Sequence, residues 1–216
     1  MSKVVVCISR TVAAGGESIG KAVSEQLGYR YVDEEVIKRA SEKASLDPTL
    51  VAEAEHRTSI LSRLIDAITS LRDPAPYLFT SEAPYYPPTA DVWLPPAQDD
   101  LRDLIREAIK EIAEQGRAVI VAHAASFALG ARPEILRVLV TASPATRAQR
   151  LPGAAKLLDE SDAATAVRES DEERKHYLRR FYDVREELPT HYDLVINTDT
   201  LSLNQAVSAI LAAARA

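Results

Sequence analysis

The sequence predicts an α/β fold, a doubly wound parallel sheet formed by a single domain over residues 1–216. Two observations predict it. Short, mostly apolar runs alternate along the chain with longer amphipathic or charged segments of helical character, which is typical of a parallel sheet with helices on both faces. The length of 216 residues is also sufficient for one well-buried core.

In the first half of the chain, residues 3–9 are predicted to form a strand because they are almost continuously apolar. A helix is expected over 17–27, with Gly28 just beyond its end as a stop signal. Residues 29–33 form a short second strand with an acidic residue at its tip. The segments that follow are expected to be helical over 34–44 and 48–71.

Residues 72–98 differ from the rest of the chain, because they hold seven of its twelve prolines and much of its aromatic content. So many prolines exclude a regular helix or strand. The segment is either a linker or an ordered excursion, and its Tyr, Phe and Trp content favours an excursion that packs on the protein or on a second copy. We therefore expect a homodimer.

Regular structure resumes after residue 98. Short apolar runs predict three more strands, over residues 118–122, 135–141 and 192–197. Between and after them, helices are expected over residues 99–115, 144–188 and 202–215. The carboxyl edge of such a sheet is where ligands bind in doubly wound folds.

Composition excludes several functional classes. The net charge of −6 argues against a protein of nucleic acids or membrane surfaces, which is usually basic. No apolar run is long enough to span a membrane, and no secretory signal precedes the first strand. The single cysteine, Cys7, lies in an apolar strand and cannot form an intramolecular disulfide. A cytoplasmic location is expected.

The segment between the first strand and the first helix has the layout of a phosphate-binding loop. Ala13, Ala14, Gly15 and Gly16 are small enough for their backbone N–H groups to approach an anion, and the helix start adds partial positive charge. The full pattern requires a lysine after the last glycine of the loop, and Gly16 stands in its place. Alone, the loop is also compatible with a simple tight turn.

Taken together, four segments resemble the cytidylate kinase-like family of P-loop nucleoside monophosphate kinases, whose own opening motif lacks the lysine. They occur in the family's order and are residues 8–20 (ISRTVAAGGESIG), 27–33 (LGYRYVD), 138–150 (VLVTASPATRAQR) and 192–206 (YDLVINTDTLSLNQA). The resemblance implies a P-loop kinase fold with an acceptor-side insertion over residues 34–115, helical and rich in Pro and Tyr, and a helical lid over 144–188.

The resemblance implies ATP and Mg²⁺ as cofactors. Gly15, Gly16 and the amides of the first helix would hold the β-phosphate of ATP, with Ala13, Ala14 and Glu17 in the same loop. Ser18 would help to place Mg²⁺, and Arg10 would supply the positive charge of the missing lysine.

For the acceptor and the lid, the resemblance implies roles for seven residues, which are Asp33, Arg39, His123, Arg147, Arg150, Asp171 and Arg174. Of these, Asp33, Arg39, His123 and Asp171 would bind the acceptor, and Arg147, Arg150 and Arg174 would be catalytic. The arginines at 147 and 150 would share a helix face and clamp the transferring phosphoryl group, and Asp171 and Arg174 repeat that spacing with opposite charges. Considered alone, these pairs also fit solvated helix charges, and Asp33 also fits a helix cap.

Two residues depart from the family's pattern. His123 occupies the place of an acceptor-binding arginine, and it fits a phosphate ligand, a ligand of a base edge, a proton carrier or a satisfied, partly buried side chain. Glu17 adds negative charge beside the loop. We expect an ATP-dependent phosphotransferase that acts on a nucleoside monophosphate such as CMP. The alternatives are a catalytically degenerate nucleotide sensor, or a kinase for another small acceptor shaped by His123 and residues 77–93.

Overall fold

The structure is a computed structural model that describes residues 4–33, 36, 39, 98–121, 124–154 and 160–216. The predicted helices over 34–44 and 48–71 lie outside the described residues, apart from residues 36 and 39. The proline-rich segment also lies outside them, apart from residue 98, and so does His123.

The sheet has five parallel strands in the order β2-β3-β1-β4-β5. All five coincide with predicted strands, and they are β1 (Val5–Arg10), β2 (Arg30–Val32), β3 (Ala118–Val121), β4 (Ile135–Thr141) and β5 (Leu194–Asn197). The central strand β1 pairs with β3 on one side and β4 on the other, so that Val5 faces both Ala118 and Ile135. The segment after β1 therefore leaves from the middle of the carboxyl edge.

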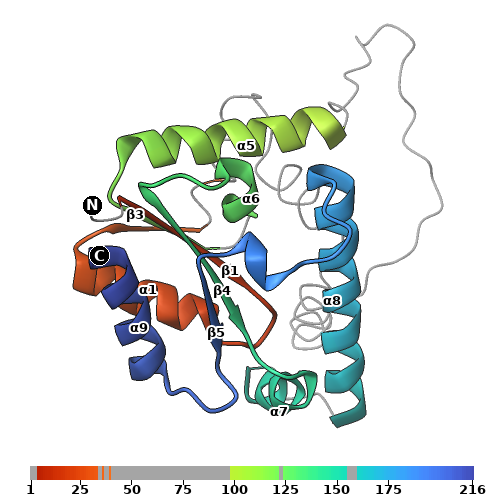
Figure 1. Cartoon of the computed structure of the whole chain (residues 1–216). Helices are drawn as coiled ribbons and strands as arrows, with labels where there is room; N and C mark the ends of the chain where they lie inside the picture. Colours follow the sequence, from red (N-terminus) through yellow and green to blue (C-terminus); the bar gives the residue numbers. More distant parts are fainter. Residues whose placement is uncertain (1–3, 34–35, 37–38, 40–97, 122–123, 155–159) are drawn as a thin grey trace, which may run out of the picture.

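Helices cover both faces of this sheet (Figure 1). One face packs against α1 (Gly16–Leu27) and α9 (Leu203–Arg215), which bury Ile19 and Val207 against the sheet. The other face packs against α5 (Gln98–Gln115) and α6 (Ala125–Leu129) through residues such as Ile109. Helices on both faces of a parallel sheet confirm the predicted fold class.

The stretch predicted to be helical over 144–188 contains two helices, and a short turn follows it. These elements are α7 (Pro144–Ala154), α8 (Glu160–Tyr182) and the 3-10 turn η1 (Pro189–His191). Pro152 and Gly153 lie in the last turn of α7. Helix α8 ends where Asp183 adopts the left-handed conformation, with φ of 54°. Helix α6 was not predicted, because five residues are too few to show a helical period.

Burial determines the ionisation state of the Cys7 thiol. Its side chain is fully buried in β1, and this burial raises the pKa of the thiol to about 12. The thiol is therefore protonated at neutral pH, which makes it a poor nucleophile. In the described part of the chain, no helix is both long and apolar enough to cross a lipid bilayer.

Candidate functional site

The candidate site is the β1–α1 loop, residues 11–15, together with the first turn of α1. Ala13 and Gly15 both adopt left-handed backbone conformations, with φ of 58° and 83°. Ala14 lies between them and is buried. Left-handed residues at such a turn bring successive N–H groups into a concave arrangement that suits an anion. Glycine adopts this conformation freely, whereas for Ala13 it costs about 1 kcal/mol.

Helix α1 begins with N–H groups that lack protein partners. Gly15 is its N-cap residue, and no side chain accepts a hydrogen bond there. Among the residues that the structure describes, no acceptor contacts the backbone N–H groups of Gly15, Gly16, Glu17 or Ser18. The first N–H groups of a helix carry partial positive charge and need acceptors. These four donors therefore suit a phosphate group.

Arg10 runs across the start of this helix. A Cβ atom on Gly16 would lie 2.6 Å from the Cβ and 3.0 Å from the Cδ of Arg10, so only glycine fits beneath it. The Nη2 atom of Arg10 lies 2.7 Å from the Glu17 carboxylate, and its side chain is 27% exposed. Its Nε atom is buried and has no hydrogen-bond partner within the described residues. One guanidinium donor at the loop is thus unused.

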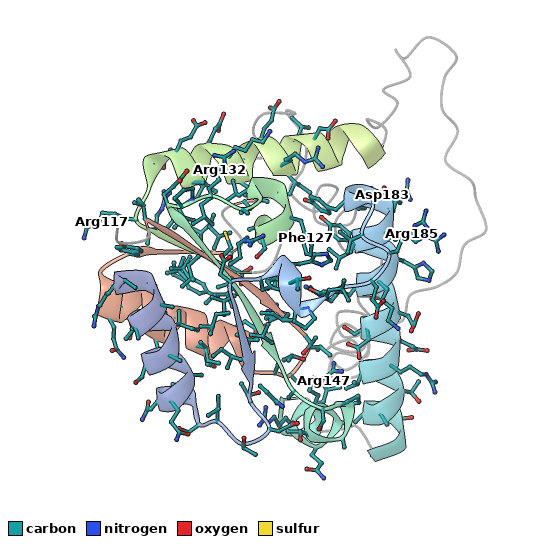
Figure 2. The ribbon with its side chains drawn as sticks, viewed as in Figure 1. Arg117, Phe127, Arg132, Arg147, Asp183 and Arg185 are labelled. Atoms are coloured by element: carbon teal, nitrogen blue, oxygen red, sulfur yellow. The ribbon has the colours of Figure 1, made fainter. Side chains whose placement is uncertain are left out.

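Arg147 joins α7 to α8 rather than facing solvent (Figure 2). Its Nη1 and Nη2 atoms donate to the two carboxylate oxygens of Asp171 at 2.9 and 2.6 Å, and its Nε donates to the carbonyl of Ala142 at 3.0 Å. The side chain is only 3% exposed. Asp171 and Arg174, which share the predicted spacing, therefore bind different partners instead of each other.

Arg150 reaches the loop through another residue. Its Nη1 and Nη2 atoms donate to the hydroxyl and the carbonyl of Thr198 at 2.9 and 2.6 Å. The Thr198 hydroxyl in turn lies 3.0 Å from the carbonyl oxygen of Ala14. Arg147 and Arg150 thus make separate contacts inside the protein, and a joint clamp on a phosphoryl group stays a prediction.

Arg174 lies near the point where β1 enters the loop. Its Nε and Nη2 atoms donate to both carboxylate oxygens of Glu187 at 2.7 and 2.6 Å, and Nη1 lies 3.4 Å from the carbonyl oxygen of Arg10. The Tyr192 hydroxyl also donates to Glu187. These contacts hold a positive charge beside the loop.

Ionisation in this cluster follows from burial and pairing. Burial alone would raise the pKa of Glu187, but the hydrogen bonds and charge of Arg174 outweigh it and hold this pKa below its usual value. Burial would likewise lower the pKa of Arg174, and Glu187 reverses that effect. Burial raises the pKa of Tyr192, so its hydroxyl stays protonated.

The predicted acceptor residues are not all brought to the loop. Asp33 follows β2 and accepts a hydrogen bond from Tyr31 at 3.4 Å, while burial, with a further contribution from Asp33, raises the pKa of Tyr31 to about 12. Arg39 lies 3.4 Å from the side chain of Gln115, next to the amino end of β3, which is the opposite edge of the sheet from the loop. His123 lies outside the described residues. The acceptor roles of these residues stay predictions.

Sequence reasoning missed Thr198, Glu187 and Tyr192. Thr198 and Tyr192 flank the last strand, within a segment whose resemblance to the family was noted, but no spacing signal marks their contacts. Glu187 lies between α8 and η1 in a run of charged residues. Their partners lie elsewhere in the chain, so only the folded structure reveals them.

Comparisons with known proteins agree with this geometry. A family model described as the cytidylate kinase-like family matches residues 5–200. The chain is similar in structure to an uncharacterized protein from Eubacterium ventriosum ATCC 27560, with 15% identity, 98% of each chain covered and a TM-score of 0.63. It is also similar to shikimate kinase from Bacteroides thetaiotaomicron, with 14% identity, 97% of each chain covered and a TM-score of 0.50. A search of curated proteins gives no match.

At such low identities, the solved structures show the fold alone, a parallel five-stranded sheet of the P-loop kinase type. The family model carries more weight because it spans nearly the whole chain, and a kinase-like family implies the general use of ATP and Mg²⁺. Its match also confirms the resemblance inferred from the four sequence segments. The chain belongs to the cytidylate kinase-like family.

Proposed function

We propose that this protein is a phosphotransferase that binds ATP with Mg²⁺ at the β1–α1 loop and moves the γ-phosphoryl group to a small acceptor. A nucleoside monophosphate such as CMP is the first candidate for that acceptor. The observation that carries the proposal is the loop itself, where the N–H groups of Gly15 to Ser18 lack protein acceptors in the described structure and lie next to the guanidinium of Arg10.

The residues at the loop fit the phosphates of a nucleotide. Gly15 and Gly16 place no side chain over the N–H groups, and the start of α1 adds partial positive charge. Arg10 offers an unused Nε donor and takes the place of the usual lysine. The exposed hydroxyl of Ser18 suits an oxygen ligand of Mg²⁺. The ion, when bound with ATP, would neutralise negative charge that develops during transfer.

Arg174 would add a second positive charge at the entrance of the loop. Its Nε and Nη2 atoms donate to Glu187 and Tyr192, whereas among the described residues Nη1 contacts only the carbonyl of Arg10, at a long 3.4 Å. An Nη1 hydrogen therefore stays available to a phosphate oxygen. Phosphoryl transfer depends mainly on positioning and on fixed positive charge around the phosphates, which is what this arrangement supplies.

A second candidate function is a nucleotide sensor without turnover. The contacts of the arginines favour it, because Arg147 is paired with Asp171, Arg150 with Thr198 and Arg10 with Glu17. A kinase needs arginines that bind the transferring group, whereas a sensor needs only the loop. The same loop serves both functions, so the measurement must separate binding from turnover.

Phosphotransfer from ATP and Mg²⁺ to a panel of nucleoside monophosphates, followed by ³¹P NMR, tests the proposal. Arg10→Ala is the informative variant because Arg10 lies over the loop and is partly exposed. Arg132→Ala is the control, since Arg132 is exposed at the end of the sheet away from α7 (Figure 2). Arg147→Ala is unsuitable, because removal of a buried partner would also disturb the fold.

The outcomes separate the two functions. Phosphorylated product that falls at least about tenfold in Arg10→Ala, and not in Arg132→Ala, supports the phosphotransferase and names its acceptor. ATP resonances that shift with the protein while no acceptor is phosphorylated support the sensor. ATP resonances that do not shift at all overturn both, and the loop is then only a turn.

A further inference from the structure

We propose that Thr198 is a positioning residue, which, with Arg150 behind it, sets the direction of the Gly15 N–H group in the β1–α1 loop. The inference rests on the proposed function, because an oriented Gly15 N–H group is useful only if the loop binds a phosphate. It also gives Arg150 a role different from the predicted clamp, since Arg150 acts on the loop through Thr198.

The hydrogen bonds around Thr198 have one consistent direction. Arg150 can only donate, so the Thr198 hydroxyl accepts from its Nη1 atom at 2.9 Å and must send its own proton elsewhere. Two carbonyl oxygens are in reach, that of Ala14 at 3.0 Å and that of Thr141 at 3.3 Å. The Thr141 carbonyl already accepts the backbone N–H of Thr198 at 2.8 Å. The Ala14 carbonyl is the nearer of the two, so we assign the hydroxyl proton to it.

The buried position of Thr198 stabilises the hydrogen bond from its hydroxyl to the Ala14 carbonyl. Its side chain is only 6% exposed, directly after β5. The Nη2 atom of Arg150 donates to its carbonyl at 2.6 Å, so the arginine holds the backbone as well as the hydroxyl. A buried hydroxyl with an accepted and a donated hydrogen bond has no freedom to rotate, and its direction is fixed.

Peptide geometry transmits this direction to Gly15. The carbonyl of Ala14 and the N–H of Gly15 belong to one planar trans peptide, so they point in opposite directions. When Thr198 holds the carbonyl on one side, the N–H faces the other side, where no described acceptor meets it. Gly15 has no Cβ and tolerates many backbone conformations, so without such a contact this peptide would rotate easily.

Three variants test the proposal. Thr198→Val keeps the shape of the side chain and removes the hydroxyl, whereas Thr198→Ser keeps the hydroxyl. Thr141→Val is the matched control, because it removes a nearby hydroxyl that, within the described part of the chain, contacts only Thr11, at 3.4 Å, and leaves the Ala14 carbonyl untouched. Affinity for inorganic tripolyphosphate with Mg²⁺ is measured by calorimetry, well below the unfolding temperature of each variant.

Thr198→Val is expected to weaken tripolyphosphate binding about tenfold, since one oriented donor is lost. Thr198→Ser and Thr141→Val are expected to bind tripolyphosphate with an affinity within about threefold of that of the unchanged protein, because the Gly15 N–H group keeps its direction. Arg150→Met is expected to weaken binding as well, and its effect and that of Thr198→Val should not add, because the two residues act through one contact. Binding by Thr198→Val equal to that of the unchanged protein overturns the proposal.

The amide resonance of Gly15 in ¹H–¹⁵N spectra provides a readout that does not depend on phosphate. It should move in free Thr198→Val and Arg150→Met and stay in place in Thr198→Ser. An unmoved resonance in Thr198→Val overturns the inference, even if ATP binds to the unchanged protein. A resonance that moves as expected, in a protein that binds neither ATP nor tripolyphosphate, upholds the contact and overturns the proposed function instead. If Thr198→Val does not fold, Arg150→Met takes its place, and an unmoved Gly15 resonance in that variant overturns the inference.

Discussion

The side chain of Arg10 occupies the space that any side chain on Gly16 would need, because a Cβ atom there would be 2.6 Å from the Arg10 Cβ. Arg10 over the loop and a lysine at position 16 therefore exclude each other. This contact gives a physical reason why position 16 holds glycine rather than lysine. It also means that any substitution of Gly16 should displace the Arg10 side chain.

Gly16→Ala should destabilise the protein by about 1–3 kcal/mol, because the added methyl group displaces the Arg10 side chain. It should also weaken ATP binding. Gly15→Ala is the matched control, since nothing lies within 4 Å of its Cβ position and its cost of about 1 kcal/mol comes from the positive φ alone. Urea unfolding and ATP titration measure both effects. Equal ATP affinity for Gly16→Ala and the unchanged protein would show that Arg10 takes no part in binding.

Glu17→Gln should raise the affinity for ATP several-fold. The Glu17 carboxylate lies 2.7 Å from the Arg10 guanidinium and competes with an incoming phosphate for it. Because both side chains are partly exposed, the ion pair itself contributes only about 0.5 kcal/mol to stability. Calorimetry at low and high salt measures the change, which should be larger at low salt. Glu25→Gln, at the exposed far end of α1, should leave the affinity unchanged.

Asp171→Ala should lower the free energy of unfolding by about 3 kcal/mol, because it leaves the buried guanidinium of Arg147 without its counter-charge. The neighbouring Glu172→Ala is the control. Its partner Lys175 is exposed, so the loss should be far smaller than that of Asp171→Ala. Urea unfolding of the two variants compares a buried pair with an exposed pair on the same helix. Equal losses would mean that the Arg147 pair is solvated in solution.

The stability of the protein should fall in acid partly because of Glu187. Its pKa is held below the usual value in the folded protein, so its contribution is complete above the unfolded pKa of about 4.3 and is lost as the pH falls through the lower, folded pKa. Glu187→Gln should remove this part of the pH dependence and cost about 2 kcal/mol at pH 7, because Arg174 loses a charged partner. Urea unfolding between pH 3 and 7 measures it. The exposed Glu186→Gln should follow the unchanged protein throughout.

Much of the fold could be predicted from the sequence, because its strands are buried on both faces and read as apolar runs. Residues such as Val6 and Val138 are fully buried. The continuous apolar runs that contain them are typical of strands that are covered on both faces. Short elements and element boundaries were harder to predict from the sequence. The end of α7 at Ala154 and the start of α8 at Glu160 were not predicted, because helix-favouring residues continue on both sides.

The candidate site could be predicted only where local sequence determines it. Small residues mark the β1–α1 loop, and Arg10 lies next to it in the chain. The spacing of Arg147 and Arg150 gives their angle around a helix, but it does not say what packs against that side. Arg147 turned out to be buried against Asp171, and Arg150 to bind Thr198. Contacts of this kind depend on where distant segments meet.

The hydrogen bonds that shape the loop come from residues that are synthesised much later than the loop itself. Ala14 and Thr198 are 184 positions apart, and Arg10 and Arg174 are 164 apart. A ribosome releases β1 and the loop long before it releases Arg174 and Thr198. Until those two residues have been released, the loop lacks these contacts, so a bound ligand should contribute less to the early stages of folding.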